Sequence, residues 1–232
     1  AVPIPEGATA SLPEGGDEHL SVVDIGRGLE WGMWHAREVE GRWMTGLGAL
    51  TDLNGDGVAP PWNEVSREFD AHRARAAGFP LIAGLIRVEE IKSGHIPHAL
   101  VFAYDFVRTE HFIPPASTAQ ASTGFTRDNV NGMPMGAHIR LAPEFDVDGS
   151  ELSESGKVIA RALQEYGAFL GDFAGGNVIY AESSPRALKE WEGILNSDEL
   201  ESVFTPEMMS RNFQLLNMGE VRRGQNYQAG KQ

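Results

Sequence analysis

The sequence predicts a mainly β protein, a β-sandwich decorated by two or three short helices. Its 27 glycines and 13 prolines favour a chain rich in turns over a helical bundle. Short apolar runs bounded by Gly, Pro, Asn and Asp recur along the chain, which is typical of strands. The best amphipathic helix covers only residues 155–166.

The first half of the chain is predicted to form strands around one helix. Trp31 and Trp34 give the second strand an aromatic character. Val65 and Phe69 share one face of a helical pattern, which Gly78-Phe79-Pro80 would end. The elements expected here are strands at 19–25, 28–36 and 42–50, a helix at 63–77, an apolar run at 81–86 and a helical turn at 88–92.

The second half alternates strands with helical turns. Residues 98–107 carry the strongest strand pattern in the chain, and residues 112–135 have the composition of a long loop. The remaining expectations are a strand at 136–141, the helix at 155–166 with Gly167 as its stop, a hairpin of 168–173 and 177–182 across Gly175-Gly176, and short helical turns within 185–213.

We expect a single domain over residues 1–232, with extended N-terminal and C-terminal segments. A chain of 232 residues that is 41% hydrophobic can bury a full core. No internal repeat or linker interrupts the pattern. The start Ala1-Val2-Pro3-Ile4-Pro5 lacks Met and is typical of an end left by signal cleavage or by trimming of the chain, and we favour signal cleavage. The expected location is therefore secreted, either extracellular or periplasmic.

Charge and composition argue against several kinds of partner. The formal net charge is −14, from 33 acidic and 19 basic residues, which argues against nucleic acid and anionic membrane surfaces. No stretch of 18 apolar residues exists, so no membrane insertion is expected. The absence of cysteine excludes disulfides and thiolate catalysis. Neither a phosphate-binding glycine loop nor a G-x-S-x-G elbow is present.

Two histidine clusters give the strongest indication of a site. His95 and His98 lie where a Gly/Pro turn enters an apolar run, and His138 and Arg140 repeat that arrangement. Polar side chains on a rigid strand are typical of functional sites. We expect His98 to serve in acid–base catalysis or to form a structural hydrogen bond. Arg140 is expected to clamp substrate or to lie on a solvated sheet face, and His95 and His138 to contact substrate.

The same histidines could instead bind a metal. Three imidazoles, from His95, His98 and His138, can form an open site with one position left for water. However, an extended backbone over residues 95–98 points alternate side chains to opposite faces. The pattern therefore favours catalysis or structure over a histidine metal centre.

Asp172 and Glu89 are the predicted catalytic carboxylates. Asp172 lies in an apolar strand, where an ionised group is costly without a partner, and flanking glycines allow another group to come close. Glu89 directly precedes the first histidine cluster. Two facing carboxylates are the minimum for glycoside hydrolysis. A chain with 33 acidic residues also supplies such pairs by chance.

Aromatic residues and one acidic turn complete the predicted set. Trp31 and Trp34 are expected to stack on sugar rings or to fill the sandwich core. No cofactor is required by any motif. Asp52, Asn54 and Asp56 match the first half of a calcium loop, so they are expected either to hold a structural Ca²⁺ or to form a plain Asp/Asn/Gly turn.

Several motifs together carry a family resemblance. They are Asp17…His19, Gly94-x-Ile96-x-His98-Ala99-Leu100, Pro134-x-Gly136-x-x-x-Arg140-Leu141, and Ala162-Leu163-x-x-Tyr166-Gly167 followed by Asp172. With them the chain resembles, over nearly its whole length, a group of secreted bacterial and fungal proteins associated with jelly-roll, polysaccharide-degrading enzymes. The resemblance implies a jelly-roll sandwich. Where that group has Asp-Ala-Ala-Gly-Leu-Pro, this chain has Arg75-Ala76-Ala77-Gly78-Phe79-Pro80.

These expectations predict a secreted carbohydrate-active enzyme that cleaves glycosidic bonds of a polysaccharide or oligosaccharide, with hydrolysis ranked above elimination. Asp172 or Glu89 would act as acid or base, with His98 and Arg140 beside them. A lyase would use Arg140 to neutralise a uronate, His98 as base, and Tyr104 or Tyr166 as acid. The same residues are also compatible with a non-catalytic glycan-binding module or with a histidine-metal oxidoreductase.

Overall fold

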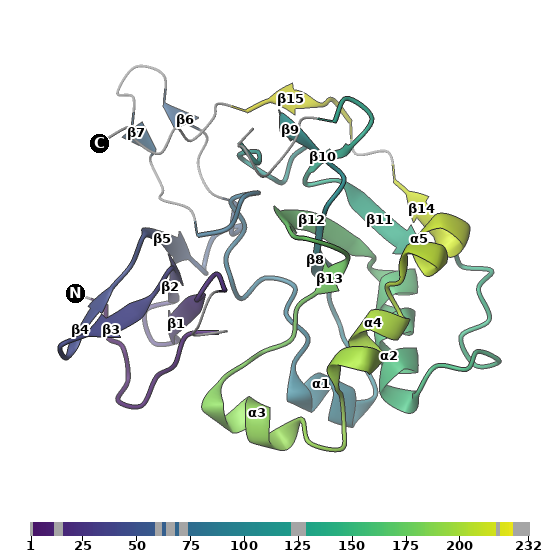
Figure 1. Cartoon of the computed structure of the whole chain (residues 1–232), viewed down its shortest axis with the longest axis horizontal. Helices are drawn as coiled ribbons and strands as arrows, with labels where there is room; N and C mark the ends of the chain where they lie inside the picture. The colour runs from purple at the N-terminus through teal and green to yellow at the C-terminus, as the bar shows by residue number, and fades with distance from the viewer. Residues whose placement is uncertain are drawn as a thin grey trace.

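The computed structural model describes residues 2–11, 16–58, 62–63, 68–69, 74–121, 129–216 and 219–224, with 62–63 and 68–69 described as backbone only (Figure 1). Fifteen strands and five helices lie in these ranges. The mainly β class is confirmed, but the expectation of two or three helices is wrong, because the segment at 185–213 forms three helices by itself. No helix in the ranges given has the length and apolar character needed to span a bilayer.

The N-terminal strands form an antiparallel sheet in the order β1-β2-β5. Its strands are β1 (Leu20–Asp24), β2 (Leu29–Trp34) and β5 (Leu47–Asp52). The strand predicted at 42–50 is two strands, since β4 (Arg42–Met44) pairs with β3 (Arg37–Val39) and β5 pairs with β2. The break lies at Thr45, whose hydroxyl bonds the carbonyls of Trp34 and Leu47.

One face of this sheet carries a small apolar core. It consists of Leu20, Val22, Met33 and Ala36, with Val2, Ile4, Ala10, Trp31 and Trp43 packed against it. The opposite face of β2 lies against the segment that begins at Ala74. There a Cβ on Gly32 would stand 3.2 Å from Leu81 Cγ and 3.4 Å from Ala74 Cβ. The glycine thus allows the sheet to pack directly on the rest of the molecule.

The central sheet has five strands in the order β13-β8-β12-β11-β14. They are β8 (Leu100–Tyr104), β11 (His138–Leu141), β12 (Ala168–Phe173), β13 (Val178–Ile179) and β14 (Phe213–Leu215). The predicted hairpin is wrong, because β8 lies between β12 and β13 and pairs with both. Residues 100–103 are all buried, which suits a strand at the centre of a sheet.

The pairing of β8 with β12 is parallel, whereas β13 and β11 pair with their neighbours antiparallel. The central sheet is therefore mixed. A jelly roll is built from antiparallel strands, so this pairing does not demonstrate one. The part of the predicted fold class that is confirmed is a strand-rich chain with several sheets.

A third sheet lies beyond the end of β8. The predicted strand at 98–107 ends at Tyr104, and after a bend β9 (Val107–Phe112) begins. It pairs with β10 (Met133–Met135) and β15 (Arg222–Arg223). The predicted loop at 112–135 thus ends in a strand.

The helix predicted at 63–77 is wrong where it can be checked. The backbone of β6 (Trp62–Asn63) pairs with that of β7 (Glu68–Phe69), and residues 74–77 form a bend and turn. Residues 64–67 and 70–73 lie outside the described part of the chain.

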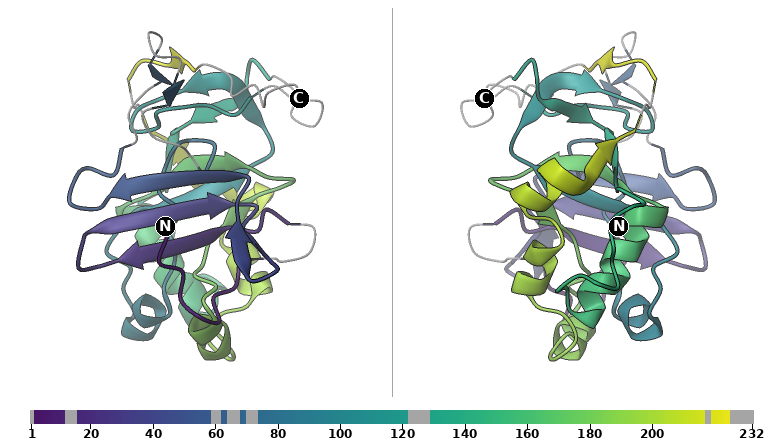
Figure 2. Two further views of the ribbon diagram at one scale, coloured as in Figure 1. Left: turned by 90° about the vertical axis from the view of Figure 1, so that its left-hand side faces the viewer. Right: turned by 90° about the vertical axis from the view of Figure 1, so that its right-hand side faces the viewer.

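The helices lie on the side of the central sheet away from the N-terminal sheet and along its lower end in the view of Figure 1 (Figure 2). The predicted helix at 155–166 is confirmed as α2 (Glu154–Glu165), and Ser153 caps it by accepting from Gly156 N. The predicted turn at 88–92 is confirmed as α1 (Val88–Ser93), with Gly94 left-handed at its end. The others are α3 (Pro185–Glu190), α4 (Ser197–Ser202) and α5 (Pro206–Asn212).

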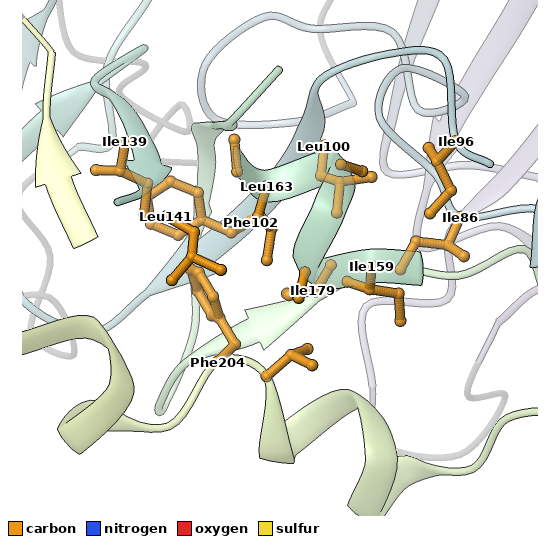
Figure 3. Close-up of a cluster of buried hydrophobic side chains, with 14 of the residues drawn as sticks. Ile86, Ile96, Leu100, Phe102, Ile139, Leu141, Ile159, Leu163, Ile179 and Phe204 are labelled. Atoms are coloured by element: carbon orange, nitrogen blue, oxygen red, sulfur yellow. The ribbon is translucent and has the colours of Figure 1, made fainter. Parts of the chain in front are cut away.

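The main apolar core fills the space between the central sheet and these helices (Figure 3). Leu100 and Phe102 of β8 meet Ile159 and Leu163 of α2 within it, and all four are 0% exposed. This core fixes β8 and β12, and β12 carries Asp172, the first residue of the site described next.

Candidate functional site

Five polar residues meet where the N-terminal sheet adjoins the central sheet: Asp17, His19, Arg75, Asp172 and Tyr180. We call them the junction cluster. Asp172 interacts electrostatically with Arg75 and Asp17, and Tyr180 with all three of these. His19 interacts with Asp17 and Arg75. They come from four separate stretches of chain: the lead into β1, the turn at 74–77, β12, and the residue after β13.

Asp172 occupies an irregular position in β12. The register against β8 shifts between Leu170 and Asp172, so Gly171 has no partner there. A Cβ on Gly171 would stand 2.4 Å from Val101 Cγ1, and the Gly171 carbonyl accepts from Ala77 N at 2.9 Å. A bulge of this kind re-aims the following side chain and lets another segment dock beside it. The docked segment is the turn that carries Arg75.

The Asp172 carboxyl keeps its proton to an unusually high pH. Burial, reinforced by the negative charge of Asp17, raises its pKa from 3.8 to about 6. Arg75 and the Phe173 N–H, which donates to Oδ1 at 3.0 Å, act in the opposite direction. The carboxyl is buried, although Asp172 as a residue is partly exposed. A carboxyl with such a pKa is suited to general acid catalysis.

Arg75 is held by groups of its own neighbourhood. It is 4% exposed, and its terminal nitrogens donate to the carbonyls of Leu81 at 3.3 Å and Ala83 at 3.2 Å. The guanidinium carbon stands 4.7 Å from the ring centroid of Tyr180, a cation–π contact. In the part of the chain that the structure describes, its buried Nε has no hydrogen-bond partner.

His19 is a neutral imidazole with one nitrogen unused. Burial lowers its pKa, although Asp17 and a hydrogen bond to the backbone of Ala74 oppose that change. Within the described ranges its Nε2 is buried without a partner. His19 thus brings a buried ring nitrogen to the junction cluster.

Tyr180 is the proton-bearing phenol of the junction cluster. Burial is the main reason that its pKa is raised, and the charge of Asp172 adds to the effect. The hydroxyl therefore stays protonated at any ordinary pH and can donate a hydrogen bond.

Trp34 lies at the exposed side of the cluster. Its Nε1 donates to Asp17 Oδ1 at 3.0 Å, and its ring stands 3.8 Å from that of His35. The indole is half-exposed, so a ligand can reach it. Trp31, the other tryptophan predicted to stack on sugar, lies on the opposite face of β2 and packs on the small core below Arg27.

The predicted catalytic residues Glu89 and His98 lie elsewhere. His98 Nε2 is 2.9 Å from Glu90 Oε1, and its Nδ1 is 2.9 Å from the carbonyl oxygen of Ala99. The ring thereby ties α1 to the start of β8, which is a structural role. Glu89 is exposed on α1 and pairs with Arg186 of α3. Neither interacts with Asp172 in the way that the junction cluster does.

Arg140 and the remaining predicted substrate contacts are also separate. Arg140 donates twice to Gln214 Oε1 of β14, both at 3.2 Å. His138 Nε2 bonds the Tyr166 carbonyl oxygen at 2.8 Å, and its ring stacks on Phe169 at 4.0 Å.

His95 and Tyr104 lie outside the junction cluster as well. The His95 ring is 6.5 Å from that of Tyr166, in the loop after α1. Tyr104 ends β8, where burial and Asp105 raise its pKa. Among the residues that can be described, no three possible ligands converge as a metal site, so a histidine metal centre gains no support.

In the acidic turn after β5, the side-chain oxygens of Asp52 and Asp56 accept hydrogen bonds from neighbouring residues of the same turn. Asp52 Oδ1 accepts from Asn54 N at 2.9 Å and from Asn54 Nδ2 at 3.1 Å, and Asp56 Oδ1 accepts from Val58 N at 2.9 Å. These are the bonds of an Asx turn. A structural Ca²⁺ at Asp52, Asn54 and Asp56 stays a prediction.

Comparison with known proteins gives no relative. No family model matches this chain, and neither the curated proteins nor the solved structures that were searched contain a match. The resemblance carried by the sequence motifs therefore stays a prediction, and the site must be interpreted from its own geometry.

Proposed function

We propose that the protein is a carbohydrate-active enzyme that hydrolyses glycosidic bonds at the junction cluster. The observation that supports this most is Asp172, a buried carboxyl with a pKa of about 6 that interacts with a second carboxylate, Asp17. Glycosidases use such a pair, in which one carboxyl is kept protonated by its surroundings and the other is ionised.

In this proposal Asp172 donates its proton to the glycosidic oxygen as the bond to the sugar breaks. Asp17, which is exposed, is the second carboxylate, and it either attacks the sugar carbon or takes a proton from the attacking water. Tyr180 donates a hydrogen bond, and His19 lies beside Asp17 and Arg75 as the imidazole of the cluster. Trp34, fixed by its bond to Asp17, offers an apolar face on which a sugar ring can stack.

These assignments replace most of the residues that the sequence alone indicates. Asp172 and Trp34 keep their predicted roles. Glu89, His98 and Arg140 give way to Asp17, His19 and Tyr180, because the first three are occupied by Arg186, Glu90 and Gln214. The proposal needs the two sheets to meet at the junction cluster and does not need a jelly roll. Secretion and a polysaccharide or oligosaccharide substrate are parts of the same proposal.

Elimination is the second candidate, because His19, Tyr180 and Arg75 are the residue types of a base, an acid and a carboxylate-neutralising cation. The obstacle is Arg75. It is 4% exposed and both of its terminal nitrogens already donate to carbonyls, so a uronate carboxylate cannot reach them. We therefore rank hydrolysis of a neutral glycan first. A glycan-binding module would not need a carboxyl with a raised pKa.

A polysaccharide panel separates these candidates. Each glycan is incubated with the protein and read both for new reducing ends and for the absorbance of unsaturated uronates. We expect reducing ends without that absorbance. Absorbance would replace hydrolysis by elimination, and retention of a glycan without either signal would make the protein a binding module.

The Asp172→Asn variant, assayed on the best substrate from that panel, tests whether the activity depends on the junction cluster. Activity should fall about 10²- to 10⁴-fold, the usual contribution of a general acid. Glu89→Gln is the matched control, since it removes an exposed carboxylate that lies outside the junction cluster, and it should stay near wild type. Equal losses in both variants would contradict the assignment.

A further inference from the structure

A fully buried carboxylate connects the N-terminal sheet to the junction cluster. Glu30 of β2 is 0% exposed, and its Oε1 accepts from Leu81 N at 3.0 Å and from Ser21 Oγ at 2.8 Å. Among the described residues its Oε2 has no hydrogen-bond partner. Glu30 is therefore neither a surface residue nor half of an ion pair.

The Leu81 backbone then continues the connection. Its N–H donates to Glu30, while its carbonyl accepts from a terminal nitrogen of Arg75 at 3.3 Å. The Ala83 carbonyl, two residues later, accepts from the other terminal nitrogen at 3.2 Å. One short segment thus holds both ends of the guanidinium, and Glu30 is the side chain that anchors this segment to the opposite sheet.

We propose that Glu30 is a positioning residue, which fixes the Leu81 backbone and thereby holds the Arg75 guanidinium over the ring of Tyr180, within the junction cluster. The role assigned to Asp172 in catalysis rests on the proposed function, but the positioning of Arg75 does not. Glu30 itself need not touch substrate.

The positioning has a consequence for Asp172 that can be measured. Arg75 lowers the pKa of this carboxyl, Asp17 raises it, and burial raises it most. Tyr180 keeps its proton throughout this range, and burial lowers the pKa of His19. If Arg75 drifts away, the positive charge that opposes protonation weakens, and Asp172 keeps its proton to a higher pH.

Two substitutions separate position from charge. Glu30→Met fills the site with an apolar chain of similar length and removes the acceptor for Leu81 N–H. Glu30→Gln also removes the charge, but its amide oxygen can still accept that bond. The two variants therefore differ in whether the Leu81 N–H keeps its acceptor. Ser21→Ala removes the other partner of Glu30 and leaves the Leu81 contact intact.

The readout is the titration of Asp172 itself, followed by the carboxyl ¹³C shift in aspartate-labelled full-length protein, so it needs no substrate. Circular dichroism confirms folding, and Glu30→Leu replaces Glu30→Met if the latter does not fold. We expect the midpoint in Glu30→Met to lie above that in Glu30→Gln by about half a pH unit or more, with Ser21→Ala near wild type. Equal midpoints in the Met and Gln variants would overturn the positioning role, whether or not the protein cleaves glycans.

Discussion

Single residues decide the chemistry of this molecule, and Asp172 is the most consequential. Folding takes its carboxyl from water into a buried position at which Asp17 adds a second negative charge, so the folded protein binds the proton more tightly than the unfolded chain does. The group that makes the site reactive is therefore also a source of instability. Such a conflict between stability and activity is common where a site must hold a strained or charged group.

Asp172→Asn should stabilise the fold in a pH-dependent way. A folded-state pKa of about 6 against an ordinary 3.8 means that wild-type stability falls as pH rises from about 4 to about 6 and stays reduced above that. The variant lacks this loss. Its free energy of unfolding should therefore equal that of wild type below about pH 4 and exceed it by about 3 kcal/mol above pH 6. Urea unfolding at acidic and neutral pH measures it. A constant difference would contradict the raised pKa.

His98→Gln tests the structural assignment of the first histidine cluster. The imidazole bonds Glu90 and the Ala99 carbonyl, and Gln cannot reproduce both geometries. We expect a loss of about 1–2 kcal/mol in the free energy of unfolding, the usual effect of losing one or two such bonds. Activity per folded molecule should survive. A stable variant with strongly reduced activity would restore His98 to the catalytic set.

Helices and strands could be predicted where the sequence pattern that specifies them is local. They could not be predicted where they depend on partners that are distant in the sequence. α2 could be predicted because its apolar stripe, its Ser153 cap and its Gly167 stop all lie within fifteen residues of one another. The hairpin of β12 and β13 could not be excluded, because the sequence does not record that β8 takes the place between them. Strand order depends on which apolar strand is buried at the centre of the sheet, which is a property of the whole core.

Two glycines with nearly the same backbone give an element-scale test. Gly94 ends α1 at φ 77°, where an added Cβ would meet nothing within 4 Å. Gly94→Ala should therefore lower the free energy of unfolding only by the strain of a left-handed alanine, about 1–2 kcal/mol. Gly167 follows α2 at φ 73°, but its Cβ would lie 2.4 Å from Ile139 O and 2.6 Å from His138 Nε2. Gly167→Ala should lower the free energy of unfolding by about 1–3 kcal/mol more than Gly94→Ala does. Urea unfolding of both variants measures this difference, and equal losses of stability would contradict the packing described for β11.

In the molecule as a whole, the site exists because two sheets with separate cores meet. Glu30 and Leu81 are 51 residues apart and bond across this junction, and Ala77 docks on Gly171 of β12. Asp172 could be found from the sequence because a carboxylate between glycines in an apolar strand is unusual. Asp17 and His19 could be recognised in the sequence only as part of the family resemblance, which assigned no role to either residue.

Arg75 shows why the rest of the site could not be predicted. It lies in a stretch with a helical pattern, and its importance comes from the carbonyls of Leu81 and Ala83 and from the ring of Tyr180. None of these contacts leaves a periodic signal in the sequence. The histidine clusters, by contrast, have a strong local pattern but serve to join α1, β8 and α2.

The proposed chemistry requires that the junction cluster keep one carboxyl protonated up to about pH 6, well above the range of an ordinary aspartic acid. The carboxyl ¹³C titration of aspartate-labelled wild-type protein measures this, with the Asp172 resonance identified by its absence in Asp172→Asn. We predict a midpoint near 6 for this resonance. A midpoint near the ordinary value of 3.8 would refute the proposed role, because Asp172 would then already be ionised between about pH 4 and pH 6, where the proposal has it hold the proton that it donates as a general acid.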